Sequence, residues 1–155
     1  MKNKIIEPNP YGPLVIEKLL AFESKLGISL PEDYRNYLIK YNGAKFENDV
    51  FLINEVEGES GIRHIRGVIQ EPSYASLLVN YDVFNIDLKN KYLAIADDAF
   101  GNQIVLKLVE PNMGGIYFWD HEIPFNKVEK ILIKVGNSFT EYIDSLKKSE
   151  TQEEF

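Results

Sequence analysis

The sequence predicts an α+β fold in which N-terminal helices pack on a mainly antiparallel sheet and a closing C-terminal helix completes the domain. Two observations support this prediction. Apolar residues recur at helical spacing in the first half of the chain and again near its end. From residue 91 onward they instead alternate with a period of two, and the turn sequences DDAFGN (97–102) and EPNMGG (110–115) interrupt the alternation.

The length and composition fit one globular domain. The chain has 155 residues, of which 45% are hydrophobic and 26% charged, so it is long enough to bury a core without covalent cross-links. It contains no cysteine, which excludes disulfides and thiolate chemistry. We expect a single domain over residues 1–155, with an irregular lead-in over 1–12 and an acidic tail over 148–155.

The net charge is −7, from 24 acidic and 17 basic residues, and no cluster of Lys and Arg is visible. Nucleic-acid binders neutralise phosphates with such clusters, so direct nucleic-acid binding is not expected. Neither a signal-peptide core nor an apolar run long enough for a membrane span is found, which favours a cytoplasmic protein without membrane contact. An acidic surface favours encounter with a basic partner, although solubility alone also explains it.

Two helices are predicted before residue 44. The first follows Pro13 and ends at Gly27, and its wide apolar stripe indicates a largely buried helix: Val15, Ile16, Leu19, Leu20, Phe22 and Leu26. The second begins at Pro31, places Glu32 and Asp33 in its first turn and stops at Gly43. Its apolar stripe is formed by Tyr34, Tyr37, Leu38 and Tyr41.

The middle of the chain predicts strands around an acidic loop, and then a third helix. Residues 49–54 form a short strand, 55–61 an acidic loop, and 62–69 a strand with an exposed basic face of Arg63 and Arg66. The third helix opens at Pro72 and Ser73. Its stripe is Tyr74, Leu77, Leu78 and Tyr81.

The second half predicts an antiparallel meander of three strands, with residues 130–135 as a further strand. We expect one face of this sheet to be buried against the helices. Trp119, the only tryptophan, is interpreted as a core residue, with an interface anchor as the alternative. In the closing helix, Ser138 and Glu141 form a capping box ahead of the stripe of Phe139, Tyr142, Ile143 and Leu146.

Few residues suggest catalysis. Asp120, His121 and Glu122 are consecutive and would gather around a metal only if a loop brought them together. His64 lies between arginines and is interpreted as an exposed histidine rather than a general base. We therefore expect no catalytic residue, no metal and no cofactor.

Four ordered sequence blocks are similar to those of a known family. The first, LGISLPEDYRNYLIKYNG, contains Leu26, Gly27, Leu30, Pro31, Asp33, Tyr34, Asn42 and Gly43. The second contains Gly101 and Asn102, the third Trp119 and Asp120, and the fourth Ser138 and Phe139. Together they resemble the SUKH superfamily, the domain typified by the yeast cell-wall-assembly regulator, over nearly the whole chain.

This resemblance implies a protein that acts by binding rather than by catalysis. Many bacterial members are immunity proteins that neutralise polymorphic toxins, often nucleases, in the producing cell. The leading hypothesis is therefore a cytoplasmic immunity protein that binds a cognate protein toxin. Its contact residues are predicted in the acidic loop and the first turn of the meander: Glu55, Glu57, Glu59, Asp97, Asp98 and Phe100. The alternatives are a small-ligand or regulatory module with a tyrosine-lined cleft, and a metal enzyme around Asp120, His121 and Glu122.

Overall fold

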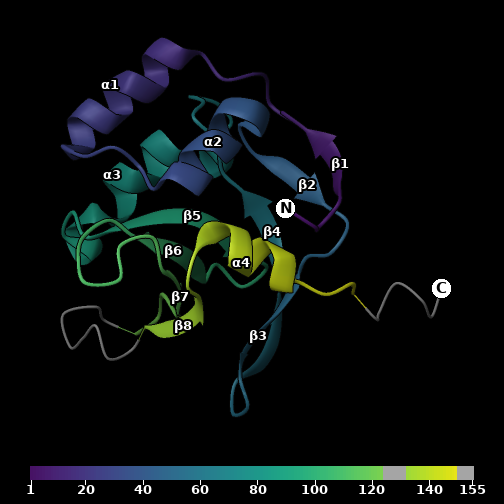
Figure 1. The fold of residues 1–155 in the computed structure, drawn as a ribbon. Coiled ribbons are helices and arrows are strands. Elements are labelled where there is room, and N and C mark those ends of the chain that lie inside the picture. The colour runs from purple at the N-terminus through teal and green to yellow at the C-terminus, as the bar shows by residue number, and fades with distance from the viewer. Residues whose placement is uncertain (124–131, 150–155) are drawn as a thin grey trace.

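The computed structural model describes residues 1–123 and 132–149, apart from the side chains of residues 86 and 87. It confirms the predicted α+β class, because helices pack on a six-stranded antiparallel sheet in sequential order (Figure 1). The elements are β1 (Ile5–Pro8), α1 (Ile16–Leu26), α2 (Glu32–Tyr41), β2 (Ala44–Phe46), β3 (Val50–Asn54), β4 (Gly58–Ile65), the 3₁₀-helix η1 (Ser73–Ala75), α3 (Leu77–Leu88), β5 (Tyr92–Asp98), β6 (Gln103–Lys107), β7 (Ile116–Trp119), β8 (Ile133–Gly136) and α4 (Phe139–Ser145).

The sheet is buried on both faces, not on one as expected. Its main face packs against the helices through Leu93, Ile95, Ile104, Leu106, Ile116 and Phe118. The opposite face holds a smaller cluster in which Trp119 packs with Leu88, Tyr92, Ala94 and Val105, which confirms Trp119 as a core residue. The sheet also curls strongly, because Cα atoms of its edge strands β3 and β8 come within 8 Å of one another.

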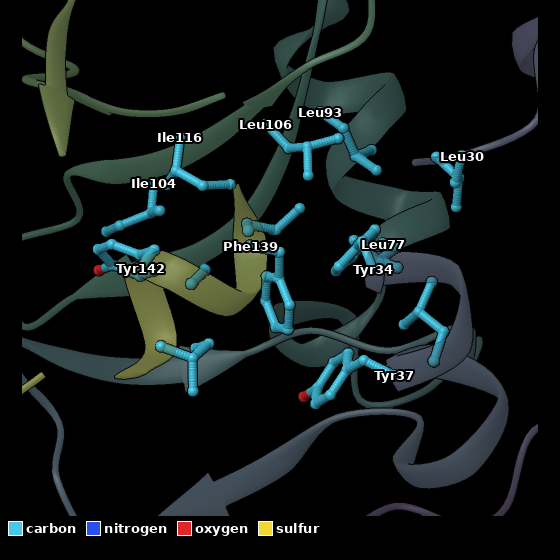
Figure 2. Packing of buried hydrophobic residues seen from close by; sticks show 14 of the residues in the cluster. Leu30, Tyr34, Tyr37, Leu77, Leu93, Ile104, Leu106, Ile116, Phe139 and Tyr142 are labelled. Atoms are coloured by element: carbon cyan, nitrogen blue, oxygen red, sulfur yellow. The ribbon is translucent and has the colours of Figure 1, made fainter. Parts of the chain in front are cut away.

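Helices α2 and α4 pack through their aromatic residues at the centre of the main core. The ring centroid of Phe139 lies 4.9 Å from that of Tyr34 and 4.6 Å from that of Tyr37. Figure 2 shows Phe139 with Tyr37 on one side and Tyr142 and Ile104 on the other. The Asp33 carboxylate joins the two helices, because one oxygen accepts from Tyr34 N (2.8 Å) and the other from the backbone N and hydroxyl of Thr140 (2.9 and 3.0 Å).

The connection between α1 and α2 is held by a buried carboxylate. Glu23 accepts from the Leu30 backbone N (2.8 Å) and forms an ion pair with Arg35 (3.0 Å). Gly27 caps α1 in the left-handed conformation at φ 75°, as predicted. The glycine and Leu30 of the sequence motif therefore build one short, fully bonded loop.

The end of α2 lies directly against the segment that leaves β4. Asn42 adopts a left-handed conformation (φ 42°), its side-chain oxygen accepts from Val68 N (2.7 Å), and its amide donates to Gly12 O (3.2 Å). The backbone of Gly67 packs so closely that a Cβ there would lie 2.4 Å from Asn42 O. This crossing gives the Asn-Gly motif a structural role.

Several expected boundaries differ from the structure. The lead-in is not wholly irregular, because residues 5–8 form β1, which pairs with β2. Helix α1 is less buried than predicted, since Ile16 and Leu20 are exposed. The predicted third helix starts only at Leu77, and Tyr74 belongs to η1.

The C-terminal expectations are met in part. Ser138 Oγ accepts from Glu141 N (3.1 Å), but the Glu141 carboxylate accepts from the Asn137 side chain (3.1 Å), so only half of the capping box forms. The strand predicted over 130–135 is seen from Ile133, and its first two residues lie outside the described ones. Of the predicted tail, residues 150–155 also lie outside them.

The Asn42–Gly67 crossing predicts a large difference between two glycine substitutions. Gly67→Ala places a Cβ against backbone atoms that cannot turn away, so we expect a loss of about 2–3 kcal/mol in the free energy of unfolding. Gly61→Ala is the control, because a Cβ there meets nothing within 4 Å. Urea unfolding of both variants measures the difference, and equal stabilities would contradict the close approach.

The buried phenols predict a loss of stability in alkali. Burial raises the pKa of Tyr34 and of Tyr142 well above the usual value of about 10. The pKa of each phenol is higher in the folded than in the unfolded protein, so its contribution to stability is fully present below about pH 10. Above that pH, each phenol lowers the free energy of unfolding by about 1.4 kcal/mol per pH unit.

We expect the free energy of unfolding of Tyr142→Phe, measured with urea, to fall less between pH 7 and pH 11 than that of the wild type. The difference should equal the contribution of one phenol. At pH 7 the variant should cost less than about 1 kcal/mol, because Tyr142 Oη has no hydrogen-bond partner among the described residues. If the free energy of unfolding of the variant falls with pH as steeply as that of the wild type, Tyr142 does not contribute to the loss of stability in alkali.

Candidate functional site: an acidic hairpin and a neighbouring groove

The β3–β4 hairpin extends away from the rest of the fold (Figure 1). Its turn is built by Asn54, whose side-chain oxygen accepts from Val56 N (3.0 Å) and Glu57 N (2.6 Å). Glu55 and Glu57 are exposed on either side of Val56, whose own exposure reaches 90%. The turn therefore presents an apolar side chain between two carboxylates.

The predicted acidic loop is shorter than expected. Glu59 lies within β4 and forms an exposed ion pair with Lys147 (2.9 Å), so the three carboxylates do not share one extended loop. Lys147 is bonded to Val50 of β3 through its backbone. Glu59 thus lies in the stem of the hairpin, opposite Leu52, while Glu55 and Glu57 lie at its tip.

The β5–β6 turn lies beside the base of this hairpin, because Ile62 of β4 pairs with Asp98 of β5. Asp98 is buried and organises the turn by accepting from Phe100 N (2.9 Å) and Asn102 N (2.9 Å). Its second oxygen accepts from Ser60 Oγ (2.9 Å), which ties the turn to β4. Phe100 projects from this turn with 78% of its surface exposed.

Four of the six predicted contact residues are exposed, and together with Val56 we call them the hairpin-end surface: Glu55, Glu57, Glu59 and Phe100. Asp98 is enclosed by the turn that it builds. Asp97 is largely covered and bonds within the fold, to His64 and Arg66. Their adjacency suggested two turn carboxylates, whereas both belong to β5.

Arg66 is the largest departure from the sequence analysis. It was expected on an exposed basic face, but it is 2% exposed. Its guanidinium donates to Tyr74 O (3.0 Å), to Ala94 O (3.2 Å) and to Gln103 Oε1 (2.7 Å), and it contacts Asp97 Oδ2 (3.4 Å). Burial lowers the pKa of Arg66 to about 10, against the opposing effect of Asp97, so the group stays cationic at neutral pH.

Asp97 in turn orients His64, which was expected to be simply exposed. Its carboxylate accepts from the His64 backbone N (3.0 Å) and lies 3.0 Å from Nδ1. A carboxylate only accepts, so Nδ1 carries the proton of this bond. The imidazole also packs on Tyr74, with ring centroids 4.4 Å apart. The Tyr11 hydroxyl donates to that of Tyr74 (3.5 Å), which raises the pKa of Tyr11 to about 12.

A groove of about 170 Å³ lies between the β1–β2 ribbon and β4, and we call it the β2–β4 groove. It is closed at one end by the bond from Ile62 N to Asp49 O (2.8 Å). At the other end Gly43 packs against the Ile65 carbonyl. Its walls include Phe46 and Leu146, and His64 and Asp49 also line it. Sequence reasoning missed this groove, because its sides come from strands far apart in the chain.

The residues expected for a metal enzyme are not brought together. Asp120 Oδ1 accepts from Glu122 N (3.0 Å), and His121 Nδ1 lies 3.1 Å from Asn102 Oδ1. Among residues 1–123 and 132–149, no group of three or more His, Asp or Glu side chains could hold a metal ion. Of the tyrosines of α2, Tyr34 is enclosed in the core, whereas Tyr37 and Tyr41 border a surface pocket that α2 forms with the N-terminal segment. In the same part of the chain, no helix combines the length and apolarity needed to cross a bilayer.

Comparison with known proteins gives two matches. The family model described as SMI1 / KNR4 family (SUKH-1) matches residues 13–145. A search of curated proteins finds the SPbeta prophage-derived uncharacterized protein YokK of Bacillus subtilis (strain 168). It is 27% identical over 146 residues, covering 84% of this chain and 73% of the relative.

The burial of the Arg66 guanidinium predicts that replacing Arg66 will reduce stability far more than replacing Arg63. Arg66→Met leaves Asp97 and three oxygen acceptors without their cation, so we expect a loss of about 3 kcal/mol or more in the free energy of unfolding. Arg63→Met is the control, because Arg63 is exposed and its replacement should change stability by less than about 0.5 kcal/mol. Urea unfolding compares the two, and similar losses would argue against a structural role for Arg66.

Proposed function

Because the chain belongs to the SMI1/KNR4 (SUKH-1) family, whose members are often immunity proteins, we propose that it binds and neutralises a cognate protein toxin. It would do so in the cytoplasm of the producing cell, by protein–protein contact and without catalysis. A nuclease is one class of toxin that this proposal includes. The family supplies the class of function, and the surface of this chain supplies the candidate contact residues.

The observation that carries the proposal is the exposure of Val56 and Phe100 among carboxylates on the hairpin-end surface. Their exposed fractions are 90% and 78%, although both are large apolar side chains. A single exposed apolar residue needs no explanation, but Val56 on the β3–β4 turn and Phe100 on the β5–β6 turn together offer two apolar anchors for a partner. Glu55 and Glu57 flank Val56 in the turn and add negative charge to this part of the surface.

This combination favours a basic toxin surface with an apolar depression. The net charge of −7 would speed the encounter by long-range attraction, and the carboxylates at the tip would fix the orientation. Val56 and Phe100 would then slow dissociation by burying apolar area. Neutralisation would follow from steric occlusion, because a toxin covered by this domain cannot reach its substrate.

The proposal is tested with the toxin domain encoded beside this chain's gene. Co-expression should restore growth, and the purified proteins should form a stable complex. Without both protection and a complex, the proposed function fails.

The contact surface is tested separately by substitution. We expect Val56→Ser and Phe100→Ser each to raise Kd about tenfold, mainly through faster dissociation. The double variant Glu55→Gln/Glu57→Gln should slow association several-fold at low salt, with a smaller effect at high salt. Val83→Ser is the matched control, because Val83 is an exposed apolar residue (57%) on α3. If Val83→Ser weakens binding as much as Val56→Ser, the hairpin-end surface is the wrong interface even where protection holds.

A further inference from the structure

The β2–β4 groove contains charges that the fold leaves uncompensated. Five titratable side chains line it: Tyr11, Lys45, Asp49, Arg63 and His64. Lys45 is paired with Glu7 (3.6 Å), and His64 is held by Asp97 (3.0 Å). Among the described residues, neither Asp49 nor Arg63 has an ion-pair partner, and they do not pair with each other. One carboxylate and one guanidinium therefore line the same small groove without direct contact.

The carboxylate is the more informative of the two. Asp49 is partly buried, and this burial raises the pKa of its carboxyl. Its backbone is fixed on both sides, since its N–H donates to Lys147 O (3.1 Å) and its carbonyl accepts from Ile62 N (2.8 Å). A fixed carboxylate that is partly removed from water, with no cation beside it, favours a ligand that brings a positive charge.

Arg63 offers a cationic partner to a negative group of the same ligand. A purely cationic ligand would meet Arg63 and Lys45, and a purely anionic one would meet Asp49. A ligand with both charges satisfies Asp49 and Arg63 together, with charge-assisted hydrogen bonds at each end. The opposed charges of the groove thus select a zwitterion.

The size and walls of the groove limit the ligand further. The volume of about 170 Å³ corresponds to roughly five or six water molecules at about 30 Å³ each, which is close to one free amino acid. Phe46, Ile62 and Leu146 provide apolar walls. His64, positioned by Asp97 and Tyr74, presents its remaining ring nitrogen as a further polar group.

We propose that the β2–β4 groove binds a free α-amino acid with an apolar side chain, with its ammonium on Asp49 and its carboxylate on Arg63. The site is separate from the hairpin-end surface, so it does not depend on the toxin-binding proposal. It would add a small-ligand site to a protein that otherwise acts through a protein interface.

The probe is L-leucine, titrated into the ¹⁵N-labelled full chain and followed by amide chemical shifts. We expect saturable shifts at Asp49, Ile62, Arg63 and His64 in the millimolar range. N-acetyl-leucine lacks the ammonium and leucinamide lacks the carboxylate, so each should bind about tenfold more weakly or worse. Isobutylamine, a cation without the carboxylate, tests the cationic alternative.

Two substitutions connect each charge of the ligand to one residue. Asp49→Asn should weaken the binding of L-leucine about tenfold but leave the binding of N-acetyl-leucine unchanged. Arg63→Gln should likewise weaken the binding of L-leucine but leave the binding of leucinamide unchanged. Glu47→Gln, an exposed neighbour that does not line the groove, is the control. Absence of saturable shifts with L-leucine, equal binding of isobutylamine, or indifference to both substitutions would overturn the proposal, and none of these results bears on toxin binding.

Discussion

The buried guanidinium of Arg66 is the interaction on which the middle of the fold depends. It is bonded to oxygens from η1, β5 and β6, so it joins three segments that are distant in the sequence. A charge buried to this degree costs free energy unless every donor is matched, and here the acceptors are two backbone carbonyls, an amide oxygen and a carboxylate. Removing any of these partners would leave the buried cation incompletely bonded and would lower the free energy of unfolding. The arrangement therefore fixes where β4 ends and where η1 lies.

A series of side-chain contacts connects Arg66, through Asp97, to the surface of the protein. Arg66 holds Asp97, Asp97 holds His64, and His64 packs against Tyr74, which contacts Tyr11 of the N-terminal segment. The wall of the β2–β4 groove is thus connected to the core by a chain of polar and aromatic contacts. A groove wall built in this way is preorganised, so a ligand would not have to spend binding free energy on ordering it.

The sequence predicted the parts of the fold that are encoded locally. Gly27 and Ser138 mark helix ends because their capping bonds join residues only a few positions apart. The alternation of apolar residues in β5, β6 and β7 likewise follows from the strand geometry alone. Arg66 and Asp98 were misplaced because their partners come from other strands. In addition, Arg66 lies just past the end of β4, where strand periodicity no longer predicts which side chains are exposed.

Strand β4 also explains why the sequence predicted only part of the candidate surfaces. Composition alone singles out Glu55 and Glu57, and the turn that presents them is local. The exposure of Phe100 follows from Asp98 turning inward, which requires Ser60 of β4 beside it. The groove exists because β3 pairs only with the first half of β4, up to Gly61, so the later residues of β4 face the β1–β2 ribbon across a gap. One strand thus supports a protruding acidic hairpin with its first half and one wall of the β2–β4 groove with its second. The register shift between Ile62 and His64 lies in the groove wall itself, where His64 is held by Asp97 and Asp97 by Arg66, so the groove depends on the Arg66 anchor more directly than the hairpin does.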